Sequence, residues 1–311
     1  MKDNNFSIIA SNKTKNSIEK TAKAIFTISA LFAILAVFSI TIYMFVSGTP
    51  AIFEVGLKEI LFGRVWRPSG ADPLYGIFYV ILTSIVGTFL AIIIGVPIGV
   101  MTAIFLAETA PGPMAAIVKP AVELLAGIPS VIYGLLGVLI LNPLLYKLEL
   151  IIFKDSPNHQ FTGGSNLLSA VLVLAIMILP TVINVSESAI RAVPKHYKSA
   201  SLALGATHMQ TIFKVILPSA KSGIMTAVVL GVGRAIGEAM AISLVAGNSA
   251  NLPLPFNSVR FLTTAVVSEM SYAADTHKRV LFTIGLILFT FIIIINLVLN
   301  RIMKGGQKDG D

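Results

Sequence analysis

Residues 77–107 read IFYVILTSIVGTFLAIIIGVPIGVMTAIFLA, a run without a charged side chain. Because a helix rises about 1.5 Å per residue, roughly 20 apolar residues cross a bilayer core of about 30 Å. This run would extend for roughly 46 Å as one helix. It must therefore overshoot the core, tilt, or break near Gly95, Pro97 and Gly99. We expect a broken or tilted membrane-spanning helix.

The rest of the chain contains further runs of this kind. They lie near 24–47, 121–146, 167–187, 222–247 and 280–302. Hydrophobic residues make up 55% of the 311 residues and charged residues 12%, with a mean hydropathy of +0.86, which excludes an ordinary soluble domain. Cysteine is absent, so disulfides, thiolate metal sites and cysteine nucleophiles are excluded. We predict an all-α polytopic membrane protein with about six transmembrane helices in one membrane domain.

The basic residues indicate where this domain meets its surroundings. The net charge is +8, and Lys and Arg cluster at the ends of apolar runs, which favours contact with membrane lipid over nucleic acid. They are more frequent in the loops that six spans with an internal N-terminus would leave in the cytoplasm. We expect a multi-pass inner-membrane protein with both termini cytoplasmic. It comprises an N-terminal segment (1–23), a transmembrane domain (24–303) and a tail (304–311).

A polar stretch at 188–218 separates two of the predicted spans. Residues 199–205 read SASLALG and residues 215–218 read VILP. Small side chains permit close helix approach, Gly205 permits a turn, and Pro218 is expected to end the segment. We expect one or two short helices beside the membrane. An amphipathic surface helix without a partner is the alternative.

This stretch resembles the EAA loop of ABC importer permeases, which implies a coupling loop that contacts an ATPase subunit. The usual glutamate of the family is replaced by serine here, so an acidic contact with the ATPase is not implied. The positions that the resemblance assigns to coupling are Ser199, Ala200, Gly205, Leu217 and Pro218.

Residues 123–135 read ELLAGIPSVIYGL, a predicted span interrupted by glycine and proline. Irregular backbone at membrane depth is tolerated only where it is buried in protein or lines a cavity. The segment resembles the signature of Pst-type phosphate permeases, carried here by Gly127, Pro129 and Ser130. A kinked helix needed only for packing is the alternative. Glu108 and Glu123, at the ends of two spans, are expected to be solvated interfacial carboxylates.

Residues 231–240 read GVGRAIGEAM and place Arg234 near mid-membrane. Such a charge is costly, so it requires a partner, and Glu238 one helical turn later is the expected one. The arginine fork suits a phosphate oxyanion. The segment resembles the RAxGE segment of Pst permeases, which implies that Arg234 and Glu238 lie on the substrate pathway. A static ion pair is the alternative. Gly233–Gly237, like Gly95–Gly99, indicates close helix packing.

The resemblance covers roughly residues 60–303 and favours the C-type subunit of the Pst system. It implies a type I importer permease (MetI-like) fold and a transport subunit for inorganic phosphate that is not an enzyme. The implied partners are a dimeric ATPase, an A-type sister permease and a periplasmic or extracellular phosphate-binding protein. No P-loop motif occurs, so ATP hydrolysis belongs to a partner, and neither a cofactor nor a metal site is expected.

Three alternatives remain open at this stage. The first is a permease for another oxyanion, such as sulfate or molybdate, because an arginine recognises such anions by charge and shape only. The second is a secondary transporter or channel without an ATPase, in which the charged residues relay ions. The third is a membrane scaffold.

Overall fold

The computed structural model describes residues 13–157 and 159–308. The chain forms two compact units, which meet between residues 47 and 48. The first unit consists of most of helix α1 (Lys13–Ala51), whose apolar stretch has no buried residue within the structure. Residues 1–12 of the predicted N-terminal segment lie outside the described residues, as do residues 309–311 of the predicted tail. Residues 304–308 belong to the last helix.

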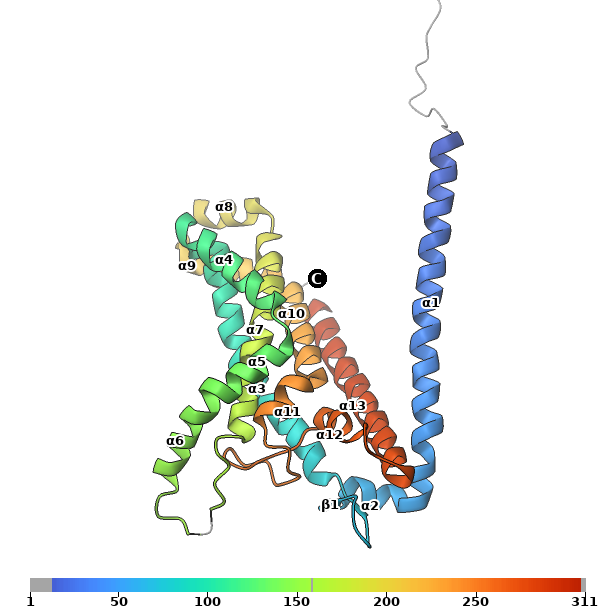
Figure 1. Ribbon diagram of the computed structural model, residues 1–311. Helices are drawn as coiled ribbons and strands as arrows, with labels where there is room; N and C mark the ends of the chain where they lie inside the picture. The colour runs from blue at the N-terminus through green and yellow to red at the C-terminus, as the bar shows by residue number, and fades with distance from the viewer. Residues whose placement is uncertain (1–12, 158, 309–311) are drawn as a thin grey trace, which may run out of the picture. The chain divides into compact units, whose positions relative to one another are not determined.

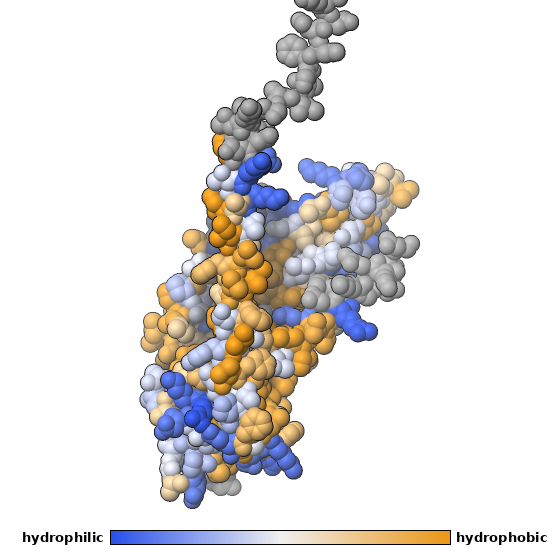
Figure 2. All heavy atoms as spheres, turned by 90° about the vertical axis from the view of Figure 1, so that its right-hand side faces the viewer, coloured by the Kyte–Doolittle hydropathy of each residue, from blue (hydrophilic) through white to orange (hydrophobic). Residues whose placement is uncertain are grey.

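Six helices among the described residues are long and apolar enough to cross a membrane. They are Ile18–Phe62, Phe78–Thr109, Ser130–Ile152, Leu167–Arg191, His208–Gly237 and Asp275–Leu299. The face of the molecule in Figure 2 is mostly hydrophobic, and hydrophilic residues gather toward its ends. The prediction of an all-α protein with six membrane-spanning helices is confirmed.

The second unit follows α1 with short elements and then the long helices. They are a π-helical turn (Ile52–Gly56), α2 (Leu57–Phe62), β1 (Trp66–Arg67), β2 (Leu74–Tyr75), α3 (Phe78–Ile104), a π-helical turn (Phe105–Thr109), α4 (Gly112–Gly127), α5 (Ser130–Leu136), a π-helical turn (Gly137–Leu141), α6 (Asn142–Ile152), α7 (Leu167–Arg191), α8 (Lys195–Ala203), α9 (His208–Thr211), a π-helical turn (Ile212–Ile216), α10 (Leu217–Gly237), α11 (Met240–Val245), α12 (Leu262–Glu269) and α13 (Asp275–Lys308). The strands form an antiparallel hairpin with Trp66 opposite Tyr75. Helices α4, α8 and α9 gather at one end of this unit, and α2, β1 and α12 lie at the other (Figure 1).

Helix α7 forms the centre of the second unit, and its packing explains why α3 stays intact. A Cβ atom on Gly95 would lie 2.7 Å from Ile178 Cδ1, and one on Gly99 would lie 2.8 Å from Val182 Cγ1. These glycines are contact points with α7, as expected, and they are not hinges. Helix α3 runs unbroken through Pro97, so of the two expected alternatives, a broken or a tilted helix, the break does not occur. Pro97 has no N–H and so cannot donate a backbone hydrogen bond within α3. Packing of α3 along α7 compensates for this missing bond.

Predicted spans differ from the observed helices at their ends, and in two cases the cause is a break in the backbone helix. The run expected at 121–146 is divided, because α4 ends at Gly127 and the span begins at Ser130. The run expected at 222–247 begins earlier, at His208, and ends at Gly237, with α11 as a separate short helix. Hydropathy detected the apolar stretches, whereas local backbone breaks set their limits.

Pro218 does not end the coupling segment, contrary to the prediction. The helix continues from α9 through the π-helical turn into α10, with proline in the first turn of α10. The amide of Leu217 donates to the carbonyl of Ile212, five residues back. This wider turn accommodates a residue that has no N–H and whose ring crowds the preceding turn.

Candidate functional site

Glu238 lies beyond the end of the helix that carries Arg234. Helix α10 ends at Gly237, and Glu238 has an extended backbone with ψ of 130°. Its buried carboxylate accepts the backbone N–H of Ala241 at 2.9 Å, and its carbonyl accepts the hydroxyl of Thr263 at 2.7 Å. The expected Arg234–Glu238 ion pair is absent from the described residues, so that prediction is wrong. Glu238 instead joins α10, α11 and α12.

Arg234 makes its protein contact with α7. Its Nη1 donates to the hydroxyl of Thr181 at 3.3 Å, and its charge is close enough to Tyr133 for an electrostatic interaction. The side chain is half-buried and belongs to the last turn of α10, where the helix dipole favours a cation. A guanidinium has five N–H donors in a planar fork. Within the described residues, donors therefore remain for the oxygens of an anion.

The signature segment forms the predicted interruption. Gly127 ends α4, Ile128 and Pro129 are extended, and Ser130 begins α5. Tyr133 bridges this break, because its hydroxyl donates to the carbonyl of Leu125 at 2.6 Å.

The same region brings the signature and the Arg234 segment together. A Cβ on Gly134 would lie 2.8 Å from Cα of Ala241, so α5 and α11 approach closely. By contrast, a Cβ on Gly127, Gly233 or Gly237 would meet no atom within 4 Å. The close packing expected at Gly233–Gly237 is therefore not made within the described chain.

The predicted coupling segment consists of two short helices joined by a tight turn. Ser199 and Ala200 lie in α8, and Gly205 forms the expected turn with a positive φ of 85°. Helix α8 has no buried residue, and the hydroxyl of Ser199 donates to the carbonyl of Lys195 in the same helix. Leu217 begins α10, after the π-helical turn. The exposed surface of α8 is free to meet a partner.

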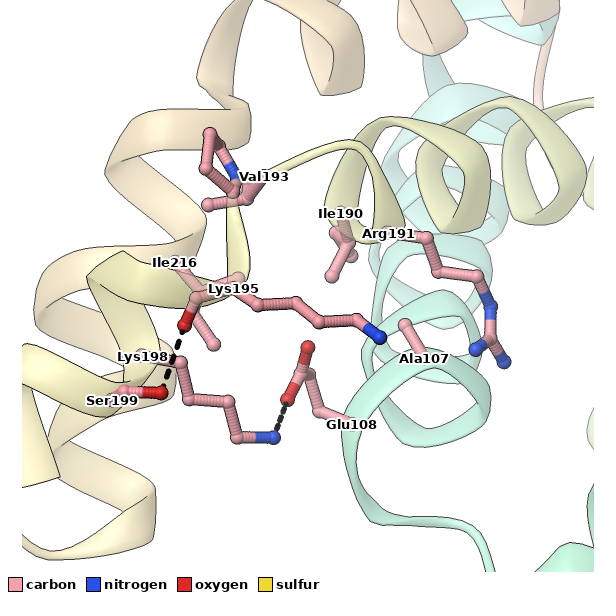
Figure 3. Close-up of a pocket in the computed structure, with 10 residues that line it drawn as sticks. Ala107, Glu108, Ile190, Arg191, Val193, Lys195, Lys198, Ser199 and Ile216 are labelled. Carbon is pink, nitrogen blue, oxygen red and sulfur yellow. Dashed lines mark hydrogen bonds and ion pairs between the residues drawn. The ribbon is translucent and has the colours of Figure 1, made fainter.

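A pocket of about 530 Å³ lies between α8 and the end of α3. Figure 3 shows Lys195 and Lys198 extending from α8 across this pocket, and Nζ of Lys198 lies 2.5 Å from Oε2 of Glu108. The side chain of Glu108 is only 11% exposed. The prediction of a solvated carboxylate at this position is wrong. Glu108 and Lys198 are 90 residues apart, so no sequence spacing could have joined them.

Another buried carboxylate, Glu269, organises the opposite end of the unit. Glu269 accepts the indole N–H of Trp66 at 3.2 Å and lies 2.8 Å from Nε2 of His277, and it forms an ion pair with Arg260. Burial is the main cause that raises the pKa of the adjacent Tyr75 phenol above its ordinary value. The sequence analysis missed this cluster, because its members come from four separate segments.

Comparison with known proteins shows the family. The family described as binding-protein-dependent transport system inner membrane component matches residues 95–305. The probable ABC transporter permease protein YqgH of Bacillus subtilis is 37% identical over 303 residues, covering 94% of this chain and 95% of that protein. The phosphate transport system permease protein PstC of Pasteurella multocida is 36% identical over 266 residues, covering 81% and 82%.

Solved structures show the same fold. A bacterial alginate ABC transporter in complex with an alginate pentasaccharide-bound periplasmic protein matches with a TM-score of 0.63 and 13% identity, covering 93% of this chain and 94% of that chain. The inward-facing MetNI methionine ABC transporter matches with a TM-score of 0.51 and 21% identity, covering 74% and 94%. This chain belongs to the binding-protein-dependent transport system inner membrane components, and it is a multi-pass ABC importer permease subunit, not an enzyme, with PstC permeases among its relatives.

Proposed function

We propose that this chain is the C-type membrane subunit through which an ATP-driven importer moves inorganic phosphate across the inner membrane. The observation that carries the proposal is the guanidinium of Arg234, half-buried in a membrane-spanning helix and bonded to Thr181 through one of its donors. A cation in this setting suits a multiply charged oxyanion. Relatives named phosphate transport system permeases, such as those of Pasteurella multocida and Haemophilus influenzae, support phosphate as that anion.

In this proposal Arg234 holds the anion as its water is shed, and the breaks around it shape the pathway. The signature residues Gly127, Pro129 and Ser130 form the break where α4 passes into α5. Glu238 stabilises a similar break between α10 and α11, because its carboxylate accepts a backbone N–H in the first turn of α11. The paired breaks fit a path that opens and closes as helices move.

The coupling segment is the proposed contact site for a dimeric ATPase. Its contact positions are Ser199, Ala200, Gly205, Leu217 and Pro218, and the absence of buried residues among those of α8 supports this role. An A-type sister permease and an extracellular phosphate-binding protein complete the complex.

We place the α8 end and both termini in the cytoplasm and the hairpin end outside. ATP binding in the partner would move α8 and so rock the helices, and this chain needs no cofactor for that step.

The test is ATP-dependent uptake of radiolabelled phosphate by vesicles that carry the complete complex. We expect Arg234→Gln to assemble normally and to lower uptake about tenfold to a hundredfold, since one or two charged hydrogen bonds to the anion are lost. Lys278→Gln removes an exposed cation elsewhere and is the matched control. Normal uptake by Arg234→Gln would remove this residue from the pathway.

Competing anions and energy sources separate the alternatives. Unlabelled sulfate or molybdate in excess should leave phosphate uptake unchanged. If wild-type vesicles took up one of these anions and no phosphate, the substrate assignment would be wrong while the importer role would stand. Uptake driven by a pH gradient without ATPase would contradict the importer role itself.

A further inference from the structure

Three side chains from the coupling region converge on the end of α3. Nη2 of Arg191 donates to the carbonyl of Leu106 at 2.8 Å, and Nζ of Lys198 binds Oε2 of Glu108 at 2.5 Å. Nε2 of His208 lies 3.2 Å from the carbonyl of Glu108. The three donors come from the end of α7, from α8 and from α9, so the whole coupling segment is anchored on residues 106–108.

The end of α3 is suited to accept these donors. The last carbonyls of a helix have no partner within the helix, and cations are favourable there. Helix α3 ends in the π-helical turn Phe105–Thr109, closed by a 2.7 Å bond from the amide of Ala110 to the carbonyl of Phe105. Buried apolar residues nearby, including Ile104, Ile190 and Ile216, pack this end firmly onto α7 and α10. The acceptors are therefore fixed in place.

Helix α8, in contrast, is attached weakly. None of its residues is buried, and Leu204 at its end is 89% exposed. Within the described residues, its side-chain hydrogen bonds to other elements are the Lys198–Glu108 pair and a 2.9 Å bond between the hydroxyls of Ser201 and Thr211. The second contact only joins α8 to the helix that follows. The ion pair is the contact that sets how α8 lies relative to α3.

We propose that Glu108 is a positioning residue for energy coupling. By holding Lys198, it fixes α8 to α3, so a displacement of α8 is passed to a helix that runs the full length of the membrane domain against α7. Loss of the pair would leave α8 joined to the rest of the protein by its flanking turns and by the Ser201–Thr211 bond to α9, and more of its movement would be taken up locally. This inference rests on the proposed role of α8 as a contact site for the ATPase.

The test measures phosphate transported per ATP hydrolysed by the complete complex in proteoliposomes. We expect Glu108→Gln and Lys198→Gln each to lower this ratio by about twofold to thirtyfold, while ATP hydrolysis continues. The exchange of both residues, Glu108→Lys with Lys198→Glu, restores the pair and should recover most of the ratio. Glu19→Gln removes an exposed carboxylate of α1 and is the control.

The outcomes distinguish this inference from the function on which it rests. An unchanged ratio in the single variants, or an exchange variant no better than either one, would overturn the role of Glu108. If one single variant failed to assemble, the other and the exchange variant would still decide it. If the wild-type complex moved another oxyanion instead of phosphate, the same ratio measured with that anion would test Glu108, and only the substrate assignment would fall.

Discussion

Replacing Glu269 by Gln should destabilise the hairpin end of the protein strongly. This carboxylate is 4% exposed and accepts from Trp66, Arg260 and His277 at once. Glutamine has nearly the same shape as glutamate but lacks the negative charge that faces Arg260 and His277. Removing one partner of a buried ion pair costs about 3–5 kcal/mol. At roughly 2–4 °C per kcal/mol for a chain of this size, the unfolding midpoint should fall by about 6–20 °C.

Thermal unfolding of the purified full chain in detergent measures this shift. Trp66 is the only tryptophan of the chain and donates to Glu269, so its fluorescence reports on the cluster directly. Glu54→Gln is the control, because that carboxylate is 38% exposed and pairs with Arg279 at the surface. Its loss should cost less than about 1 kcal/mol. Equal shifts for the two variants would refute the argument from burial.

Two further substitutions test the packing around the proposed pathway. Gly95→Leu should lower the unfolding midpoint by the equivalent of about 1–3 kcal/mol, because its Cβ would lie 2.7 Å from Ile178. Gly112→Leu is the control, because a Cβ at Gly112 would meet no atom within 4 Å, and it should leave the midpoint unchanged. Tyr133→Phe removes the bond to the carbonyl of Leu125 across the signature break and should cost about 1–3 kcal/mol in the same assay, and an unchanged midpoint would show that the break does not depend on it.

Features that depend on one stretch of sequence were predicted well. Apolar runs fix the number of spans, because each must match the thickness of the bilayer by itself. The interruption at Gly127 and Pro129 and the turn at Gly205 were predicted for the same reason, since the backbone preferences of these residues are local. Pro97 and Pro218 are exceptions: α3 continues through Pro97, and the π-helical turn before Pro218 allows that helix to continue.

The pairing of charges could not be predicted in this way. The expected contact between Arg234 and Glu238 assumes that the helix continues through both residues. Helix α10 ends between them, and the carboxylate caps α11 while the guanidinium turns to Thr181 on α7. Contacts with other helices decided this outcome.

The sequence by itself determined the fold class, the six spans and the family, because hydropathy and short motifs are properties of single segments. Only the tertiary structure decided which charges meet. The Glu108–Lys198 pair and the Glu269 cluster join residues from separate segments. Such contacts depend on where helices come to lie after packing, so neither composition nor spacing along the chain specifies them.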